Sequence, residues 1–313
     1  MKISVVIPTY NCARYLPLAL DSALAQTRPA DEIIVVDDGS SDDSQTLVEQ
    51  RYGSRVRYIR QVNAGPAAAR NNGIRAASGD VIGFLDADDI WFPETLAHVA
   101  DCIDSLPQVA LVSADKQAID SDGVVTAPSW WDRNGVREAL YADGGRPIEA
   151  PLARLVRTNF INTSLAFVRR TALDDVGLFD ETIRYGEDYE LWLRIAARHA
   201  VVCLPEVLGQ YRLHQNNTTR ATEPMLKDFV VVSRKLREWG RSALKAAGID
   251  ADRTVSDALC DLGYWYFCAG RMPEARDRLG ESLREQLNLR AFKYMLASLL
   301  PATALARLRK QQD

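Results

Sequence analysis

Gly79-Asp80-Val81-Ile82-Gly83-Phe84-Leu85-Asp86-Ala87-Asp88-Asp89 is the stretch of sequence that decides the fold. Its apolar run from Val81 to Leu85 has no amphipathic alternation, which is typical of a strand buried on both faces of a parallel sheet. Three carboxylates follow within four residues, and such a cluster repels itself unless a cation lies among them. Because ligands bind at the carboxyl ends of strands in open α/β sheets, the stretch predicts a divalent cation that bridges the cluster to a phosphorylated ligand. The alternative is that Asp88 and Asp89 only begin the next helix, where acidic residues are favourable.

Length and composition describe an ordinary globular protein. The 313 residues suggest two domains, or one domain with an extension. The net charge is −4 and no long Lys/Arg run occurs, which argues against nucleic acid as a partner. The five cysteines form no C-x-x-C pair, the N-terminus does not resemble a signal peptide, and no apolar segment is long enough to cross a bilayer. We therefore expect a reduced, cytoplasmic protein.

Apolar strand patterns alternate with helical patterns around the acidic stretch. The predicted strands of the first half are Ile3 to Ile7, which we expect Pro8 to end, then Glu32 to Val36, Val56 to Arg60 and Val81 to Leu85. Those of the second half are Val109 to Ala114, Ser164 to Val168, Val201 to Leu204 and Val207 to Leu213. Short connections between them predict an α/β fold, with a mostly parallel sheet flanked by helices.

The composition changes to long helical patterns from about Pro224. We therefore predict an α/β domain over residues 1–222 and a helical extension over 223–313. Residues 257–285 resemble a single tetratricopeptide-like hairpin. The segment from Leu287 to Lys310 is basic and amphipathic, so it is either a helix on an anionic membrane surface or an ordinary packing helix.

Several motifs at predicted strand ends together resemble one family. They are Val5-Val6-Ile7-Pro8-Thr9-Tyr10-Asn11, Ile34-Val35-Val36-Asp37-Asp38-Gly39-Ser40, Gly65-Pro66-Ala67-Ala68-Ala69-Arg70-Asn71-Asn72-Gly73, Phe84-Leu85-Asp86-Ala87-Asp88-Asp89, Glu187-Asp188 and Tyr211-Arg212-Leu213-His214. Over roughly the first 220 residues the chain resembles the family 2 glycosyltransferases of the GT-A fold, an inverting group that uses nucleotide-diphosphate sugars. The resemblance implies sugar transfer, with a UDP-sugar as the expected donor, to an acceptor hydroxyl on a glycan or a lipid-linked molecule in cell-surface polysaccharide or glycoconjugate synthesis.

The resemblance makes residues 1–222 the catalytic domain, with a nucleotide-binding half over about 1–115 and an acceptor half over about 116–222. It also assigns roles to residues that bind the donor. Asp88, with Asp86 nearby, is expected to hold Mn²⁺ or Mg²⁺, which neutralises the leaving diphosphate. Asp86, next to Ala87, is also expected to touch the ribose. Arg70 either supplies a cation for the diphosphate or orients Asp86. The residues expected to surround the base and ribose are Pro8, Thr9, Tyr10, Asn11 and Asp38, the last as an acceptor for the N3–H of a uracil ring.

The acceptor side depends on the later motifs. Asp188 is the expected general base and Glu187 is the second candidate, although both could simply favour the N-terminus of a helix. His214 is either a third metal ligand or a structural residue. Trp130 and Trp131 are either sugar-stacking rings or core residues.

Two other functions remain open at this point. A nucleotidyltransferase also combines such a sheet with a metal and nucleoside phosphates, but it usually begins with a Gly-rich loop that is absent here. A non-catalytic interaction module on a transferase-like domain is the second alternative, although the acidic motifs are intact. We also expect a peripheral contact with the cytoplasmic face of a membrane through the C-terminal helices.

Overall fold

A computed structural model describes residues 1–214 and 222–300, and it divides the chain into two units, Met1–Asn217 and Thr218–Asp313. The division lies within residues 215–221, which the structure does not describe, close to the predicted boundary after residue 222. Each unit has its own apolar core.

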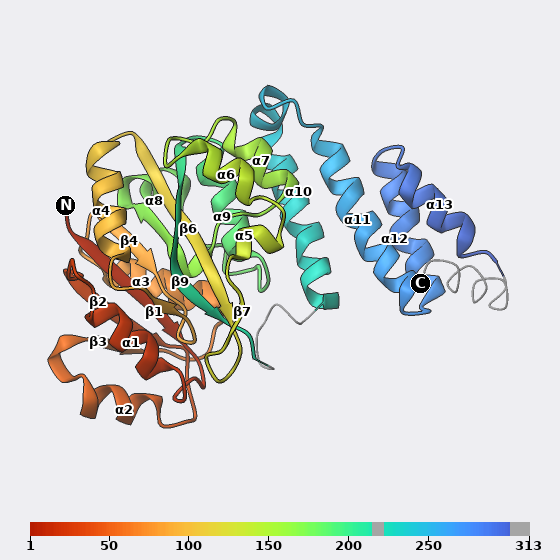
Figure 1. The fold of residues 1–313 in the computed structure, drawn as a ribbon. Coiled ribbons are helices and arrows are strands. Elements are labelled where there is room, and N and C mark those ends of the chain that lie inside the picture. Colours follow the sequence, from red (N-terminus) through yellow and green to blue (C-terminus); the bar gives the residue numbers. More distant parts are fainter. Residues whose placement is uncertain (215–221, 301–313) are drawn as a thin grey trace. The chain divides into compact units, whose positions relative to one another are not determined.

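The first unit is built on one nine-stranded sheet with helices on both faces (Figure 1). The spatial order of the strands is β3-β2-β1-β4-β8-β6-β9-β5, with β7 paired to β6. The strands are β1 (Ile3–Thr9), β2 (Glu32–Asp37), β3 (Arg57–Arg60), β4 (Val81–Phe84), β5 (Ile90–Trp91), β6 (Val109–Ile119), β7 (Val125–Ala127), β8 (Ala166–Arg169) and β9 (Ala200–Arg212). The helices are α1 (Leu16–Leu24), α2 (Ser44–Arg51), α3 (Pro66–Ala76), α4 (Thr95–Ser105), α5 (Trp130–Arg133), α6 (Arg137–Asp143), α7 (Pro151–Arg157), α8 (Arg170–Val176) and α9 (Glu187–Ala196).

The α/β class with a mostly parallel sheet is confirmed, but β5, β7 and β8 pair antiparallel with their neighbours. β1, β2, β3 and β4 pair in parallel, as do β6 and β9. β8, however, lies antiparallel between β4 and β6. The acidic stretch therefore follows a strand with one parallel and one antiparallel neighbour. All four residues of β4 are buried, as its continuous apolar run predicts.

Alternating residues of the central strands build two apolar layers. Val5 and Val35 point to the face that α1 and α4 cover, whereas Ile34 and Val36 pack against Ala69 of α3 on the other face. The chain thus needs apolar residues at consecutive positions, which is why these strands lack amphipathic alternation.

One sequence prediction about a strand limit is wrong. Pro8 does not end β1, which continues to Thr9 beside β2. The pairing of β1 with β4 stops at Val6. Pro8, which has no N–H to donate, has its nitrogen on the β4 side of β1, beyond the end of that pairing. No hydrogen bond of the sheet is therefore lost. Residue 115, the approximate limit between the two predicted halves, lies inside β6, whose pairing with β9 continues to Ile119.

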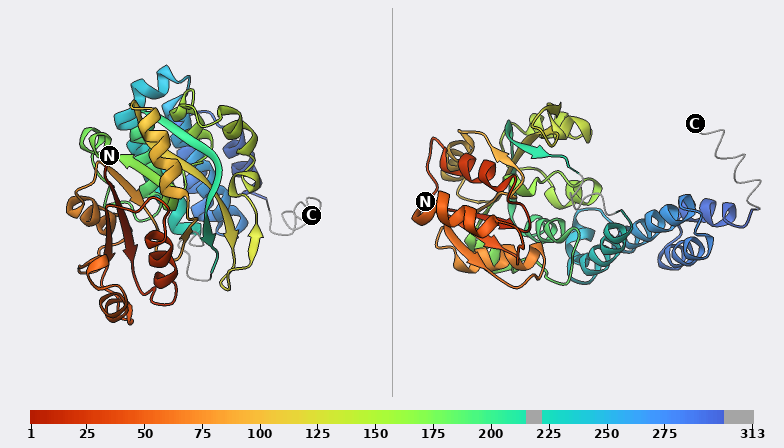
Figure 2. Two further views of the ribbon diagram at one scale, coloured as in Figure 1. Left: turned by 60° about the vertical axis from the view of Figure 1, so that its left-hand side comes forward. Right: turned by 90° about the horizontal axis from the view of Figure 1, so that it is seen from below.

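The described part of the second unit, residues 222–300, contains four helices, seen from two further sides in Figure 2. They are α10 (Thr222–Ala246), α11 (Ala251–Cys268), α12 (Met272–Glu285) and α13 (Leu289–Ala297). α11 and α12 form the helical hairpin that the sequence predicts, and Gly263 of α11 closely approaches Leu279 of α12. Buried residues of α10 and α13 complete its core. Among the described helices, none combines the length and apolar character that a membrane crossing requires.

Candidate active site

Ser164 joins two of the three carboxylates that follow β4. Its hydroxyl lies 3.1 Å from Oδ2 of Asp86 and 2.5 Å from Oδ2 of Asp89. Ser164 belongs to a short 3-10 helix, Thr163–Leu165, that enters β8. The turn itself is closed by the backbone N–H of Asp89, which donates to the carbonyl of Asp86 at 3.1 Å. The antiparallel strand thus brings a hydroxyl between carboxylates that would otherwise repel each other.

Arg70 connects the acidic turn to the later acidic motif. One nitrogen of its guanidinium lies 2.8 Å from Asp86 and another lies 2.7 Å from Glu187, and the side chain is almost fully buried. Burial lowers the pKa of Arg70, but the charges of Asp86 and Glu187 outweigh this and raise it above its ordinary value. Burial likewise raises the pKa of Asp86, but Arg70 holds it below its usual range. Of the two predicted roles for Arg70, this geometry favours the orientation of Asp86.

Asp88 and His214 form the second contact of the acidic turn. Oδ2 of Asp88 lies 2.9 Å from Nε2 of His214, whose ring stacks on Tyr15 with a centroid distance of 5.2 Å. Arg212 holds the same region, since its Nε donates to the carbonyl of Asp88 at 3.1 Å and its backbone N–H donates to Asp89 at 3.0 Å.

The Asp88–His214 pair fits a divalent cation whose remaining ligands come from a substrate and from water. Within residues 1–214 and 222–300, no three His, Cys, Asp or Glu side chains are grouped so as to hold a metal ion. A carboxylate and an imidazole at one point supply two donors, and Mg²⁺-type ions commonly complete their coordination with phosphate oxygens and water. Asp86, predicted as a further ligand, instead has its oxygens engaged by Arg70 and Ser164.

Asp188 and Glu187 lie at the N-terminus of α9 but have different surroundings. Glu187 is buried against Arg70, and burial together with the charge of Asp188 raises its pKa to about 7. Asp188 is half-buried; one oxygen accepts from the Thr163 hydroxyl at 2.5 Å and the other from the backbone N–H of Tyr189 at 2.7 Å. Asp188 is therefore the acid of the pair that keeps access to a ligand.

The residues predicted to surround the base and ribose lie at the ends of β1 and β2. The backbone N–H of Asp38 donates to the carbonyl of Thr9 at 2.9 Å, and the Asn11 amide oxygen accepts from the backbone of Ser41 at 2.8 Å. The Asp38 carboxylate accepts bonds from Gln61, Ala64 and Gly65, all at 2.8 Å, so it shapes the loop before α3.

The remaining members of this group differ in exposure. Tyr10 is 55% exposed, and its ring is open to a ligand. The Thr9 hydroxyl, by contrast, is enclosed and has no hydrogen-bond partner among the residues that the structure describes, and Ala87 is buried. Pro8 is half-buried within β1.

Sequence reasoning gave no role to four residues that the structure brings to the site: Thr163, Ser164, Arg212 and Lys116. Arg212 lies in one of the quoted motifs, and the other three also had a signal in the sequence. A polar run precedes the apolar strand that begins at Ala166, and Lys116 interrupts an otherwise core-like strand. The two tryptophans also separate, because Trp131 is a fully buried core residue whereas Trp130 is half-buried beside Tyr211.

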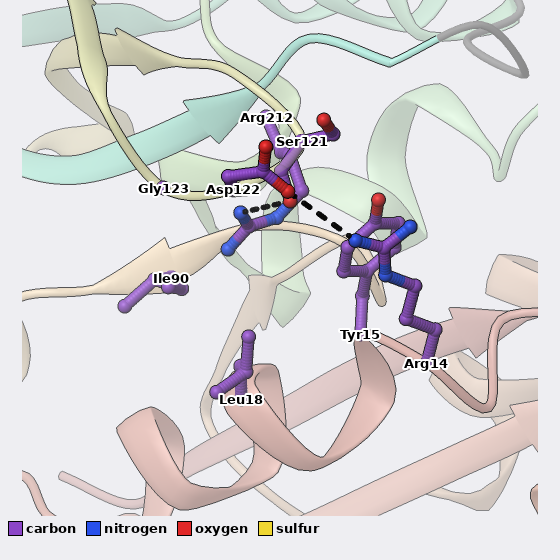
Figure 3. Close-up of a pocket in the computed structure, with 8 residues that line it drawn as sticks. All are labelled: Arg14, Tyr15, Leu18, Ile90, Ser121, Asp122, Gly123 and Arg212. Atoms are coloured by element: carbon purple, nitrogen blue, oxygen red, sulfur yellow. Dashed lines mark hydrogen bonds and ion pairs between the residues drawn. The ribbon is translucent and has the colours of Figure 1, made fainter.

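An open pocket of about 430 Å³ adjoins the Asp88–His214 pair (Figure 3). Tyr15 and Arg212 form one side of it, and both also contact that pair. Arg14 and Asp122 both line the pocket and form an ion pair at 3.5 Å, and the hairpin turn at Gly123 forms part of its wall. The pocket therefore lies beside the acidic turn and does not contain Asp86 or Asp188 among its lining residues.

Comparisons with known proteins agree with this geometry. The family model described as glycosyl transferase family 2 matches residues 4–165. An uncharacterized glycosyltransferase of Rickettsia prowazekii is 30% identical over 228 residues, which are 72% of this chain and 69% of that protein. Chondroitin synthase of Escherichia coli is 28% identical over 242 residues, which are 76% of this chain and 33% of that one.

A solved structure shows the same fold at lower sequence similarity. The S. aureus protein TarS, in complex with UDP-GlcNAc, is 18% identical, with a TM-score of 0.73 over 99% of this chain and 92% of that chain. The sequence left a nucleotidyltransferase and a non-catalytic module open as alternatives, and the family match favours neither. The chain belongs to glycosyltransferase family 2.

Proposed function

We propose that this glycosyltransferase moves a sugar from a nucleotide-diphosphate sugar, in particular a UDP-sugar, to an acceptor hydroxyl with inversion at the anomeric carbon. The observation that carries the proposal is a pair of half-buried acids, Asp88 beside His214 and Asp188 beside Thr163. Their sequence neighbours Asp86 and Glu187 both pair with Arg70. The similarity to TarS, solved with UDP-GlcNAc, supports the donor class, and the relative named chondroitin synthase supports a glycan as acceptor.

The chain's own residues account for the proton transfer. Asp188 accepts the proton of the acceptor hydroxyl as the oxygen attacks the anomeric carbon, and the bond from that carbon to the diphosphate oxygen breaks. The electron pair of the broken bond leaves with the nucleoside diphosphate. Because attack and departure occur on opposite sides of the carbon, a single step inverts its configuration. Thr163 holds the Asp188 carboxylate in one orientation for this step.

Asp88 and His214 would hold the divalent cation, Mn²⁺ or Mg²⁺, with Asp86 oriented beside them by Arg70. Such an ion supplies Lewis-acid neutralisation of the charge that develops on the leaving diphosphate. Tyr10 presents its open ring for the base, while Asp38, Asn11 and Thr9 form the strand ends below it.

Metal-dependent donor binding tests the proposal. UDP should raise the melting temperature of the full chain more with Mn²⁺ than with EDTA, and Asp88→Asn should remove that difference. Asp174→Asn, which removes an exposed carboxylate elsewhere, should retain it. Equal UDP effects with and without metal in the wild type would overturn the metal assignment, and the absence of any UDP effect would overturn the donor class.

We further propose that the second unit brings the enzyme to the cytoplasmic face of a membrane that carries the acceptor. Along α13, Leu289, Phe292 and Leu296 recur at helical spacing and are 75%, 49% and 51% exposed. Lys293 lies on the same helix and is exposed. Exposed apolar side chains beside cations are the features by which helices bind anionic lipid surfaces.

A further inference from the structure

Lys116 is a buried cation of β6 that the proposed chemistry does not use. Its side chain is only 9% exposed. The ammonium lies 3.9 Å from the centre of the Tyr211 ring and 5.5 Å from that of Trp130, and these two rings contact each other edge to face. Tyr211 comes from β9, the parallel neighbour of β6, so the sheet register brings it beside Lys116. The three side chains form a small aromatic box around one positive charge.

Asp115, the residue before Lys116, holds in place the segment that contributes Trp130 to the aromatic box. Asp115 is fully buried, and its carboxylate accepts the Ser129 hydroxyl at 2.5 Å and the backbone N–H groups of Trp130 and Trp131 at 3.1 Å each. Trp131 is in turn fixed in the core through its indole N–H, which donates to the carbonyl of Phe160 at 2.9 Å. The segment that carries Trp130 is therefore held rigidly against the strand that carries Lys116.

The Lys116 ammonium has no anionic partner in the part of the chain that the structure describes. No carboxylate oxygen lies within 4.0 Å of it, although a buried ammonium is costly unless it is paired. Burial lowers the pKa of Lys116, while the charges of the site carboxylates oppose this; those carboxylates are Asp89, Asp86, Asp188 and Asp88. Lys116 thus lies near the site carboxylates but too far from them to form an ion pair. Its contacts with the two aromatic rings offset only part of the free-energy cost of burying the ammonium.

Arg70 is less suited to bind an anionic group of a substrate, because its guanidinium already pairs with Asp86 and Glu187. We propose that the Lys116 ammonium binds an anionic oxygen group of a substrate, a phosphate or a carboxylate, within the box that Trp130 and Tyr211 form. The inference rests on the proposed function. The anionic group could come from either of two sources, the diphosphate of the donor or an acidic substituent of the acceptor. In the second case, Trp130 and Tyr211 would also stack on the sugar that carries the substituent.

Calorimetric titration of UDP in the presence of Mn²⁺ is the first part of the test. Lys116→Met removes the charge at similar length, Lys116→Arg keeps it, and Lys2→Met removes an exposed lysine as a matched control. If the donor diphosphate is the source, Lys116→Met weakens UDP binding at least tenfold, while the other two variants stay within about threefold of the wild type.

Acceptor probes are the second part, with the protein saturated by UDP and Mn²⁺. If an acidic acceptor is the source, UDP binding is unchanged in all variants. The wild type then binds D-glucuronate at least tenfold more tightly than D-glucose, or glycerol 3-phosphate more tightly than glycerol, in saturation-transfer NMR. Lys116→Met abolishes that preference and Lys116→Arg retains it.

The outcomes separate this proposal from the proposed function. If the wild type binds UDP and neither UDP nor the acidic probes distinguish Lys116→Met from it, the Lys116 assignment is overturned while the donor class stands. If the wild type does not bind UDP at all, both fall. Because an unpaired buried charge is replaced by an apolar group, Lys116→Met should melt no lower than the wild type. A lower melting temperature together with unchanged binding would show that Lys116 is structural.

Discussion

Asp188 and Glu187 show how two adjacent acids acquire different properties from their surroundings. Glu187 points to the buried side of α9, where Arg70 and the low dielectric of the interior act on it, whereas Asp188 is half-buried beside Thr163. A pattern of two acids before a helix cannot distinguish these environments. The side chain that remains accessible is the one suited to accept a proton.

Asp188→Asn should leave UDP binding within about twofold of the wild type and should reduce sugar transfer by roughly a hundredfold or more, the usual scale of general-base catalysis. The amide keeps the size of the side chain but cannot take the proton. Steady-state kinetics with the identified acceptor would measure the loss, and Asp174→Asn is the control for one lost charge. Transfer at the wild-type rate would mean that another group is the base.

Glu187 gives the folded protein a pH dependence near neutrality. Its pKa is raised to about 7 in the folded state, so between its ordinary value of 4.5 and about 7 the folded protein binds a proton that the unfolded chain has released. The stability that this proton contributes is present at low pH and is lost as pH rises to 7. At about 1.4 kcal/mol per pKa unit, the loss amounts to at most about 3.5 kcal/mol.

Glu187→Gln should therefore flatten the fall in unfolding free energy between pH 5 and pH 7.5. Urea unfolding at the two pH values measures it, and Glu149→Gln, an exposed carboxyl, serves as the control. The Gln variant also weakens the contact with Arg70, but the resulting loss of unfolding free energy is present at both pH values. An equally steep fall in both proteins would contradict the assignment to Glu187.

At the scale of elements, the packing of α3 on β1 places Arg70 in the site. Gly73 lies three residues after Arg70 on this helix, and a Cβ at Gly73 would lie 2.3 Å from Cγ1 of Val6 and 3.3 Å from Val36. The close approach of helix and sheet therefore depends on the absence of a side chain. It also explains why a glycine is tolerated inside a helix at a cost of about 1 kcal/mol.

Gly73→Ala should lower the free energy of unfolding by about 1–3 kcal/mol, because overpacking outweighs the gain in helix propensity. Arg75→Ala on the exposed side of the same helix should change it by less than about 0.5 kcal/mol, since its pair with Glu181 is exposed. Urea titration of both variants would test this. If Gly73→Ala were as stable as the wild type, α3 would have to move away from the sheet without cost.

At the scale of the whole molecule, the two units carry different features. The first unit contains all the acidic strand-end motifs and the Arg70 network. The second unit has its own core, and its exposed apolar residues include several of α13. This arrangement is consistent with chemistry in one unit and attachment in the other.

The full chain should co-sediment with anionic liposomes at low salt and should be released as salt rises, since basic residues contribute on the order of 1 kcal/mol each near such a surface. Replacing both Phe292 and Leu296 by Ser should abolish the binding without altering UDP binding. Val62→Ser, at an 89% exposed position of the first unit, is the matched control. If the wild type ignores such liposomes, the membrane proposal fails and α13 is a packing helix.

The order and type of most elements follow from the sequence alone, as do the motifs of the site. Continuous apolar runs such as Val81 to Phe84 can only be buried on both faces, and the polar residues after them must then gather at one edge of the sheet. These properties are local, because they depend on the spacing of residue types along the chain. The family and the presence of acids at the strand ends could be predicted for this reason.

Only the tertiary structure decided which of these residues meet. The antiparallel insertion of β8 brings Ser164 between Asp86 and Asp89, and the approach of α9 gives Glu187 to Arg70 and leaves Asp188 accessible. Lys116 acquires its aromatic box from a strand and a helix that are distant in the sequence. Contacts of this kind depend on strand order, direction and register, which side-chain spacing does not specify, because the same apolar run can pair with either neighbour in either direction.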